Sequence, residues 1–218
     1  MAVNIVTGQR GKAHITSDDD RARNAEMFGS GKFVFNEFGG RLWANKVGPN
    51  DNNHIVISSG MCMNQGTQMG IELGDTTELF VENNSAGYQR FDLVVMRYSR
   101  DFEENTEQAE LVVIKGDPAQ QNAVIPYSKM KVGNILDADG QEDDMPLWVL
   151  RLNGTELQAP TADDCLYKLR SGYKPTNPDD PDPGQEVDPT GTFLITTETV
   201  DRLWGARLED GDAEVYNG

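Results

Sequence analysis

Two apolar segments separated by an acidic stretch dominate the middle of this 218-residue sequence. Residues 90–98 read RFDLVVMRY, and residues 110–115 read ELVVIK. β-Branched and aromatic residues favour strands, and apolar runs of this kind favour strands that are buried on most of their surface. The intervening residues 101–108 are too polar to bury, so we expect a solvated hairpin loop there. Gly116 and Pro118 end the second strand, because proline cannot donate to a ladder.

Shorter strand patterns, separated by turn residues, recur on both sides of this hairpin. They cover residues 33–35, 42–44, 54–58, 68–73, 78–82 and 147–152. Gly39 and Gly40 lie between the first two, a pattern typical of a hairpin. Many short strands at regular spacing favour a sandwich or a barrel over α/β units. The sequence therefore predicts a mainly β protein built as an antiparallel β-sandwich.

One helix is predicted, at about residues 18–28, ahead of the first strand. Thr16 or Ser17 can cap it, and the three Asp residues at 18–20 suit the positive end of a helix dipole. Ala22, Ala25 and either Met27 or Phe28 are expected to face the core, and Gly29 to end the helix.

The composition changes sharply after the sandwich domain, which we assign to residues 1–172. Residues 173–191 are acidic and proline-rich, cannot form a packed core, and are predicted to be an extended linker. Residues 192–218 are too few to fold alone. Phe193 and Trp204 in this small C-terminal segment are therefore expected to bury against other copies or a neighbouring protein.

The charge and the polar motifs exclude several classes of function. A net charge of −17 argues against nucleic-acid binding, which needs clustered Lys and Arg. Residues 137–144 resemble a calcium loop in composition, but Gly140 stands at the wrong position. A solvated acidic loop without a metal ion is the favoured interpretation. His14 and His54 are the only histidines and belong to no catalytic motif, so no catalytic residue, cofactor or enzymatic activity is predicted.

Cysteine usage and hydropathy bear on the compartment. Cys62 and Cys165 have no metal-ligand spacing, and two buried free thiols are favoured over a disulfide. The N-terminus lacks the features of a signal peptide, and no apolar run is long enough to span a membrane. We expect synthesis in a cytoplasm and no membrane insertion. Trp43 and Trp148 lie in strand patterns and are predicted to be core residues.

Several blocks of the sequence carry a resemblance to a known group. The run VNIVTGQRGKAHIT at residues 3–16, followed by the Asp-rich helix start, is similar to the opening of structural proteins from tailed phages and prophages of Firmicutes. Residues 89–98, 111–116 and 145–147 resemble later blocks of that group. The group comprises baseplate, tail-fibre and receptor-binding components. The resemblance covers roughly residues 3–155 and includes no catalytic motif.

The resemblance implies a virion structural protein of the tail tip, baseplate or fibre that contributes to host attachment. It implies a homotrimer that also binds other tail or baseplate proteins. The expected interface residues are Ile5, Val6, His14, Phe193 and Trp204. Two alternatives stay open: a carbohydrate- or receptor-binding module with a host cell-surface glycan as ligand, and a hydrolase of cell-wall or capsule glycans acting through paired carboxylates.

Overall fold

The computed structural model describes residues 15–36 and 40–170, and the backbone of residues 186–187. Its helices and strands are α1 (Ser17–Phe28), β1 (Lys32–Phe35), β2 (Ala44–Lys46), β3 (His54–Asn64), β4 (Thr67–Phe80), β5 (Gln89–Asp101), β6 (Thr106–Ile114), η1 (Tyr127–Lys129), β7 (Glu142–Asn153), β8 (Glu156–Leu157), η2 (Ala162–Asp164), β9 (Leu169–Arg170) and β10 (Glu186–Val187).

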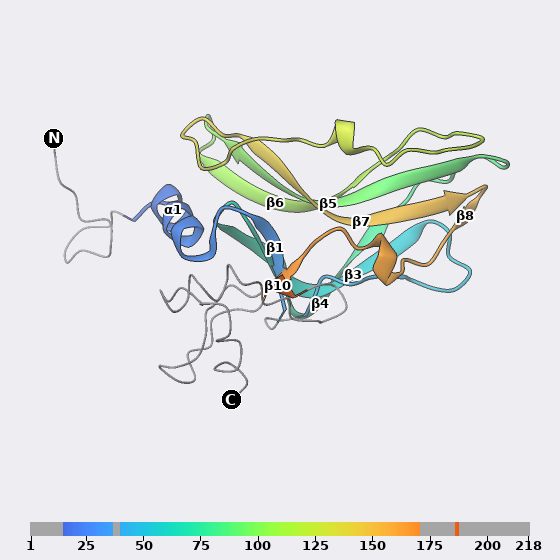
Figure 1. Ribbon diagram of the computed structural model, residues 1–218, viewed down its shortest axis with the longest axis horizontal. Coiled ribbons are helices and arrows are strands. Elements are labelled where there is room, and N and C mark those ends of the chain that lie inside the picture. The colour runs from blue at the N-terminus through green and yellow to red at the C-terminus, as the bar shows by residue number, and fades with distance from the viewer. Residues whose placement is uncertain (1–14, 37–39, 171–185, 188–218) are drawn as a thin grey trace, which may run out of the picture.

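The predicted fold class is confirmed: the protein is mainly β, with one helix near the N-terminus and two curled sheets (Figure 1). One sheet has the order β10-β9-β1-β3-β2, with β4 on the opposite side of β3. The other sheet has the order β6-β5-β7-β8. Its pairings are antiparallel, and in the first sheet β9 runs parallel to β1.

Helix α1 begins and ends where the sequence predicts. Thr16 caps it in a capping box: Asp19 N donates to Thr16 Oγ1 over 3.2 Å, and Thr16 N donates to the Asp19 carboxylate over 3.0 Å. Gly29, with a φ of 82°, follows its last turn. The predicted inward face is wrong in part, because Ala22 is exposed and Arg21 is the buried residue of this helix. Ala25 is half-buried, and Phe28 packs against the core cluster that contains Phe35.

The central hairpin is confirmed as β5 and β6. Its ladder runs from Leu93 opposite Ile114 to Asp101 opposite Thr106, so the connecting loop is shorter than the sequence indicates. The predicted burial holds for β5, which lies between two neighbours. For the predicted strand at residues 110–115 it holds in part: Ile114 is buried, residues 111–113 are half-buried, and Glu110 and Lys115 are exposed. The exposed start of β6 falls largely within the stretch that the sequence predicts to be solvated.

A second long hairpin joins β3 to β4. The hairpin predicted between residues 33–35 and 42–44 is wrong, because β1 and β2 both pair with β3 instead. The patterns at residues 68–73 and 78–82 do not form two strands: residues up to Phe80 belong to the single strand β4. Ser58 pairs with Thr76 and Gly60 with Ile71, so residues 72–75 stand opposite Ser59 alone and form a bulge in β4.

The main core lies between the two sheets and centres on Trp148. This residue is fully buried, and its Nε1 donates to Leu42 O over 2.8 Å. Trp43 is half-buried, with its ring centre 5.2 Å from that of Trp148. A smaller cluster on the outer face of the second sheet includes Leu93 and Val95 and is covered by the long connection between β6 and β7, which crosses that sheet in Figure 1.

The chain after β8 crosses back to the first sheet. Leu166 N donates to Leu147 O over 2.9 Å, and β9 then pairs with β1, so this segment connects the two sheets. β10, which lies within the predicted linker, pairs with β9. Cys62 and Cys165 are free thiols; the first is buried and the second half-buried. Within the described ranges, no helix has the length and apolar character needed to cross a membrane.

Candidate functional site

The five predicted interface residues, Ile5, Val6, His14, Phe193 and Trp204, lie outside the described residues. The first described residue is Ile15, directly ahead of α1. The structure therefore shows where the N-terminal segment joins the sandwich. That place is the start of α1, which lies beside the end of the β5–β6 hairpin (Figure 1).

Arg21 connects α1 to three strands, although its side chain is only 3% exposed. Its Nε donates to Thr67 Oγ1 of β4 over 2.8 Å. Its Nη2 donates to the Tyr98 hydroxyl of β5 over 2.8 Å and to Glu107 Oε2 of β6 over 2.9 Å. The guanidinium also lies 5.2 Å from the centre of the Tyr98 ring. A planar guanidinium with five N–H donors suits such divergent contacts, so one side chain joins the helix to both sheets.

A second arginine, Arg100 of β5, completes the arrangement. Its Nε donates to the Tyr98 hydroxyl over 3.2 Å, and its Nη2 pairs with Asp18 and lies 3.3 Å from Glu107. Ser17 Oγ donates to Glu107 Oε1 over 2.7 Å. We call Asp18, Arg21, Tyr98, Arg100 and Glu107 the helix clamp.

The carboxylates of the helix clamp are held in their charged form. Burial alone would raise the pKa of Asp18, but the hydrogen bonds and charges of Arg100 and Arg21 outweigh it, and this pKa is lowered. Burial likewise opposes ionisation of Glu107, and hydrogen bonds from Ser17 and Arg21 lower its pKa nonetheless. Burial raises the pKa of the Tyr98 phenol. At neutral pH the clamp therefore contains two carboxylates, two guanidinium groups and a neutral phenol.

The β3–β4 turn also contacts the helix directly. Asn24 Nδ2 donates to Gly66 O over 3.0 Å. Gly66 has a φ of 84°, and a Cβ atom there would lie 2.1 Å from the backbone oxygen of Arg21. Gln65 Nε2 donates to Gly133 O over 2.8 Å and to Asp143 Oδ2 over 3.0 Å. The turn thus fixes both the helix and the connection that precedes β7.

The acidic run at residues 137–144 is not the solvated loop that the sequence predicts. Its first part is an exposed turn, but Asp143 and Asp144 belong to β7 and are fully buried. Asp143 Oδ2 lies 2.6 Å from Lys32 Nζ, and Arg97 donates to both oxygens of Asp144 over 2.7 and 2.9 Å. The two buried charges are thus paired by cations from other strands. In the described ranges, no group of three or more His, Cys, Asp or Glu side chains could hold a metal ion.

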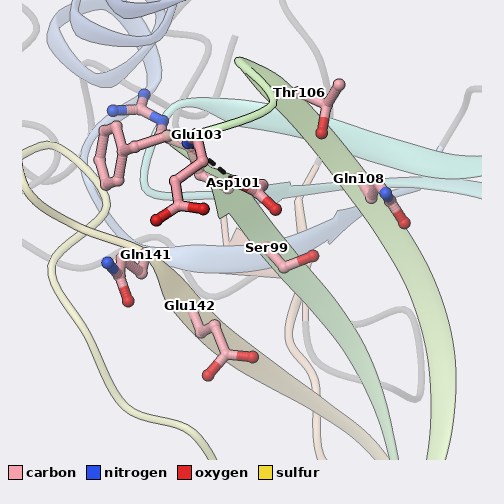
Figure 2. Close-up of a pocket in the computed structure, with 9 residues that line it drawn as sticks. Ser99, Asp101, Glu103, Thr106, Gln108, Gln141 and Glu142 are labelled. Atoms are coloured by element: carbon pink, nitrogen blue, oxygen red, sulfur yellow. Dashed lines mark hydrogen bonds between the residues drawn. The ribbon is translucent and has the colours of Figure 1, made fainter.

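Two open, polar hollows adjoin the hairpin end, with volumes of about 560 and 430 Å³. They share Arg100, Asp101, Phe102 and Thr106. Figure 2 shows the larger one, with Glu103 and Glu142 also in its lining. The Asp101 carboxylate accepts hydrogen bonds from the backbone N–H of Glu103 and Glu104, over 2.8 and 3.0 Å, and so stabilises the turn. Such a lining suits polar or cationic groups better than anions.

Within the described residues, the ring nitrogens of His54 face carboxylates rather than a nucleophile. Its Nδ1 lies 3.1 Å from the Asp51 carboxylate, as in a catalytic dyad. Its Nε2, however, lies 4.0 Å from the Glu78 carboxylate, where a hydroxyl or thiol would be required. The two tryptophans of the described residues are equally unsuited to stacking on sugars, because Trp148 is fully buried and Trp43 packs against it.

None of the five residues of the helix clamp is among the predicted site residues, and Arg21 is the central one of them. The only local signal is the spacing between Asp18 and Arg21, which places the two on one helix face. The other partners lie on strands remote in sequence, and no local pattern indicates them. No protein-family model and no curated protein sequence matches this chain.

Proposed function

We propose that this chain is a non-catalytic structural subunit of a phage tail tip, baseplate or fibre. One observation carries the proposal: the sequence blocks that resemble such proteins lie side by side in one sheet. Met96 of β5 has Leu111 of β6 on one side and Met145 of β7 on the other. These three residues come from the three later blocks of the resemblance (Figure 1).

The N-terminal block of the resemblance is attached to the same sheet. It ends at Thr16, the cap of α1, and the helix clamp fixes α1 to the end of the β5–β6 hairpin. The described residues of these blocks thus belong to a connected framework rather than to a group of reactive side chains. This supports a structural role over a catalytic one.

The subunit acts as a homotrimer within the virion, after synthesis in the cytoplasm of a bacterial host. Closed symmetric assemblies are the usual arrangement for repeated identical contacts. Ile5, Val6, His14, Phe193 and Trp204 contribute the contacts with other copies and with neighbouring tail or baseplate proteins. The subunit contributes to host attachment as part of that assembly.

Light scattering tests the oligomeric state. The full chain at micromolar concentration should have the mass of a trimer. Moderate ionic strength is required, because a net charge of −17 makes copies repel one another at low salt. A monomer mass would contradict the trimer.

Mass spectrometry of phage particles tests the location. Particles purified from an induced culture that carries the gene should contain the chain in a fixed ratio to the other tail proteins. Absence of the chain from intact particles would contradict the virion assignment.

A carbohydrate-binding module is the second candidate. The observation that favours it is Phe102, an aromatic ring that is 47% exposed at the rim of a polar hollow. Binding to host-surface glycans that is lost with Phe102→Ala and kept with Tyr127→Ala, a comparably exposed aromatic elsewhere, would support this candidate.

A further inference from the structure

The second half of β6 is an apolar strand with one unpaired edge. Within the described part of the chain, β6 pairs with β5 alone, and no backbone hydrogen bond outside this ladder involves residues 106–114. Leu111 and Val113 pack against the core between the sheets, whereas Val112 packs against the cluster on the outer face. An added strand would therefore find apolar neighbours on both of its faces.

The edge of β4 is less suitable for pairing. The bulge at residues 72–75 interrupts that strand, and Gly74 within it has a φ of 91°. A bulge of this kind bends an edge away from a partner strand. This leaves β6 as the continuous edge of the two.

The N-terminal segment joins the described structure beside the edge of β6. Ser17 Oγ donates to Glu107 Oε1, so the first described residues lie near the start of β6. Residues 1–14 contain two basic residues, Arg10 and Lys12, and no acidic residue, in a chain of net charge −17. β6 carries Glu110, which is exposed, and Glu107, which already pairs with Arg21 and Arg100. The segment and the exposed Glu110 are thus complementary in charge.

The register of pairing indicates whether the N-terminal segment pairs with its own β6 or with β6 of another copy. Residues of two antiparallel strands advance together, so a segment that starts with Ile15 beside its own Glu107 would place Gly11 opposite Leu111 and Gly8 opposite Ile114. Glycine has no side chain to pack there. The apolar residues Val3 and Ile5 would pass beyond the end of β6.

We propose that residues 3–10 of a neighbouring copy pair antiparallel with β6, with Ile5 opposite Val112. In this register Val3 lies opposite Ile114, and Arg10 lies opposite Glu107. The apolar residues of the segment then meet the apolar half of β6, and the basic residue meets its acidic half. This inference rests on the proposed homo-oligomer and names the surface and the segment that join its copies.

Disulfide trapping in mixed oligomers tests the pairing. Two differently tagged full-length chains are co-expressed, one with Thr7→Cys and the other with Glu110→Cys, which lie opposite each other in the proposed register. Both carry Cys165→Ser; Cys62 is kept, because burial raises the pKa of its thiol to about 12. Mild oxidation should link the two tags. The matched control, Thr7→Cys with Glu103→Cys, should give no link, because Glu103 lies on the same hairpin but outside the register.

Two results would overturn the proposal. One is a disulfide that forms only within a single chain carrying both Thr7→Cys and Glu110→Cys, since the segment would then pair with its own β6. The other is an oligomer that forms without any link between the tags. In both cases a trimer mass would leave the proposed function intact.

A substitution in the segment gives an independent measurement. Ile5→Asp should raise the concentration at which the oligomer half-dissociates by about tenfold or more, because a buried isoleucine is replaced by a charge. Ala2→Asp adds the same charge outside the register and should change that concentration little. Equal effects of the two variants would contradict the pairing. A monomeric wild-type chain would overturn both this inference and the proposed trimer.

Discussion

Arg90 and Asp92, two positions apart on β5, form a bidentate ion pair in which each side chain is 1% exposed. Arg90 Nε and Nη2 donate to the two oxygens of Asp92, each over 2.7 Å. Arg90 also donates to Glu82 O over 2.6 Å, and Gly116 N donates to Asp92 over 2.9 Å. The pair thus fixes the residues that follow β4 and β6 to the central strand.

Arg90→Met should reduce the free energy of unfolding by about 3–5 kcal/mol, because it leaves the Asp92 carboxylate buried without its cation. Urea denaturation provides the measurement. The matched control is Lys115→Met, which breaks the exposed pair with Glu82 and should cost at most about 1 kcal/mol. Equal losses for the two variants would contradict this account.

Arg21→Ala should release α1 while the sheets stay folded. The side chain joins the helix to β4, β5 and β6, and the helix buries no other residue. Amide hydrogen exchange should accelerate in residues 17–28 and remain slow in β5 and β7. Arg23→Ala removes an exposed pair with Asp20 on the same helix and should leave exchange unchanged. Uniform acceleration throughout the domain would show instead that Arg21 stabilises the whole fold.

The contribution of Glu107 should disappear in acid. Its pKa in the folded protein lies below the ordinary value of 4.5, so its stabilising effect is complete above that pH. The effect is lost as the pH falls through the lowered pKa. Glu107→Gln should therefore lower the melting temperature at pH 7, and the difference from wild type should shrink at pH 3. Glu26→Gln, an exposed change on the same helix, is the matched control and should change the melting temperature little.

Three glycine substitutions should form a graded series. Gly66→Ala combines a φ of 84° with a Cβ atom 2.1 Å from Arg21 O, so it should be the most destabilising. Gly74→Ala has a φ of 91° but open space around it, and should cost about 1 kcal/mol. Gly31→Ala has neither constraint and should be close to neutral. Thermal melts rank the three, and a Gly66 variant as stable as the Gly31 variant would contradict the close approach of helix and turn.

The elements that the sequence predicts well are those that local chemistry determines. Thr16 and the acids after it specify the start of α1, and the β-branched runs specify β5 and β6 as neighbours in a hairpin. The pairing of β1 and β2 with β3 could not be predicted, because the local sequence indicates a short hairpin between β1 and β2 instead.

The residues whose burial the sequence did not predict are charged groups with partners that are remote in sequence. Asp143 belongs to a run that the sequence predicts to be solvated. In the structure its carboxylate is buried and lies 2.6 Å from Lys32 Nζ. Arg21 is buried because Thr67, Tyr98 and Glu107 converge on it from three strands. Burial of a charge depends on partners that only the tertiary structure brings together, whereas burial of an apolar residue leaves a local periodic pattern.

The bulge at residues 72–75 of β4 has a consequence for the topology of association. A copy with one donating segment and one accepting edge has two connections, and units with two connections can form only rings or unbranched chains. A second accepting edge on β4 would let one copy receive two segments while another received none, so the assembly could branch. In the proposed assembly the bulge makes β4 a poor acceptor and leaves one accepting edge per copy, which favours a ring that closes at a defined number of copies.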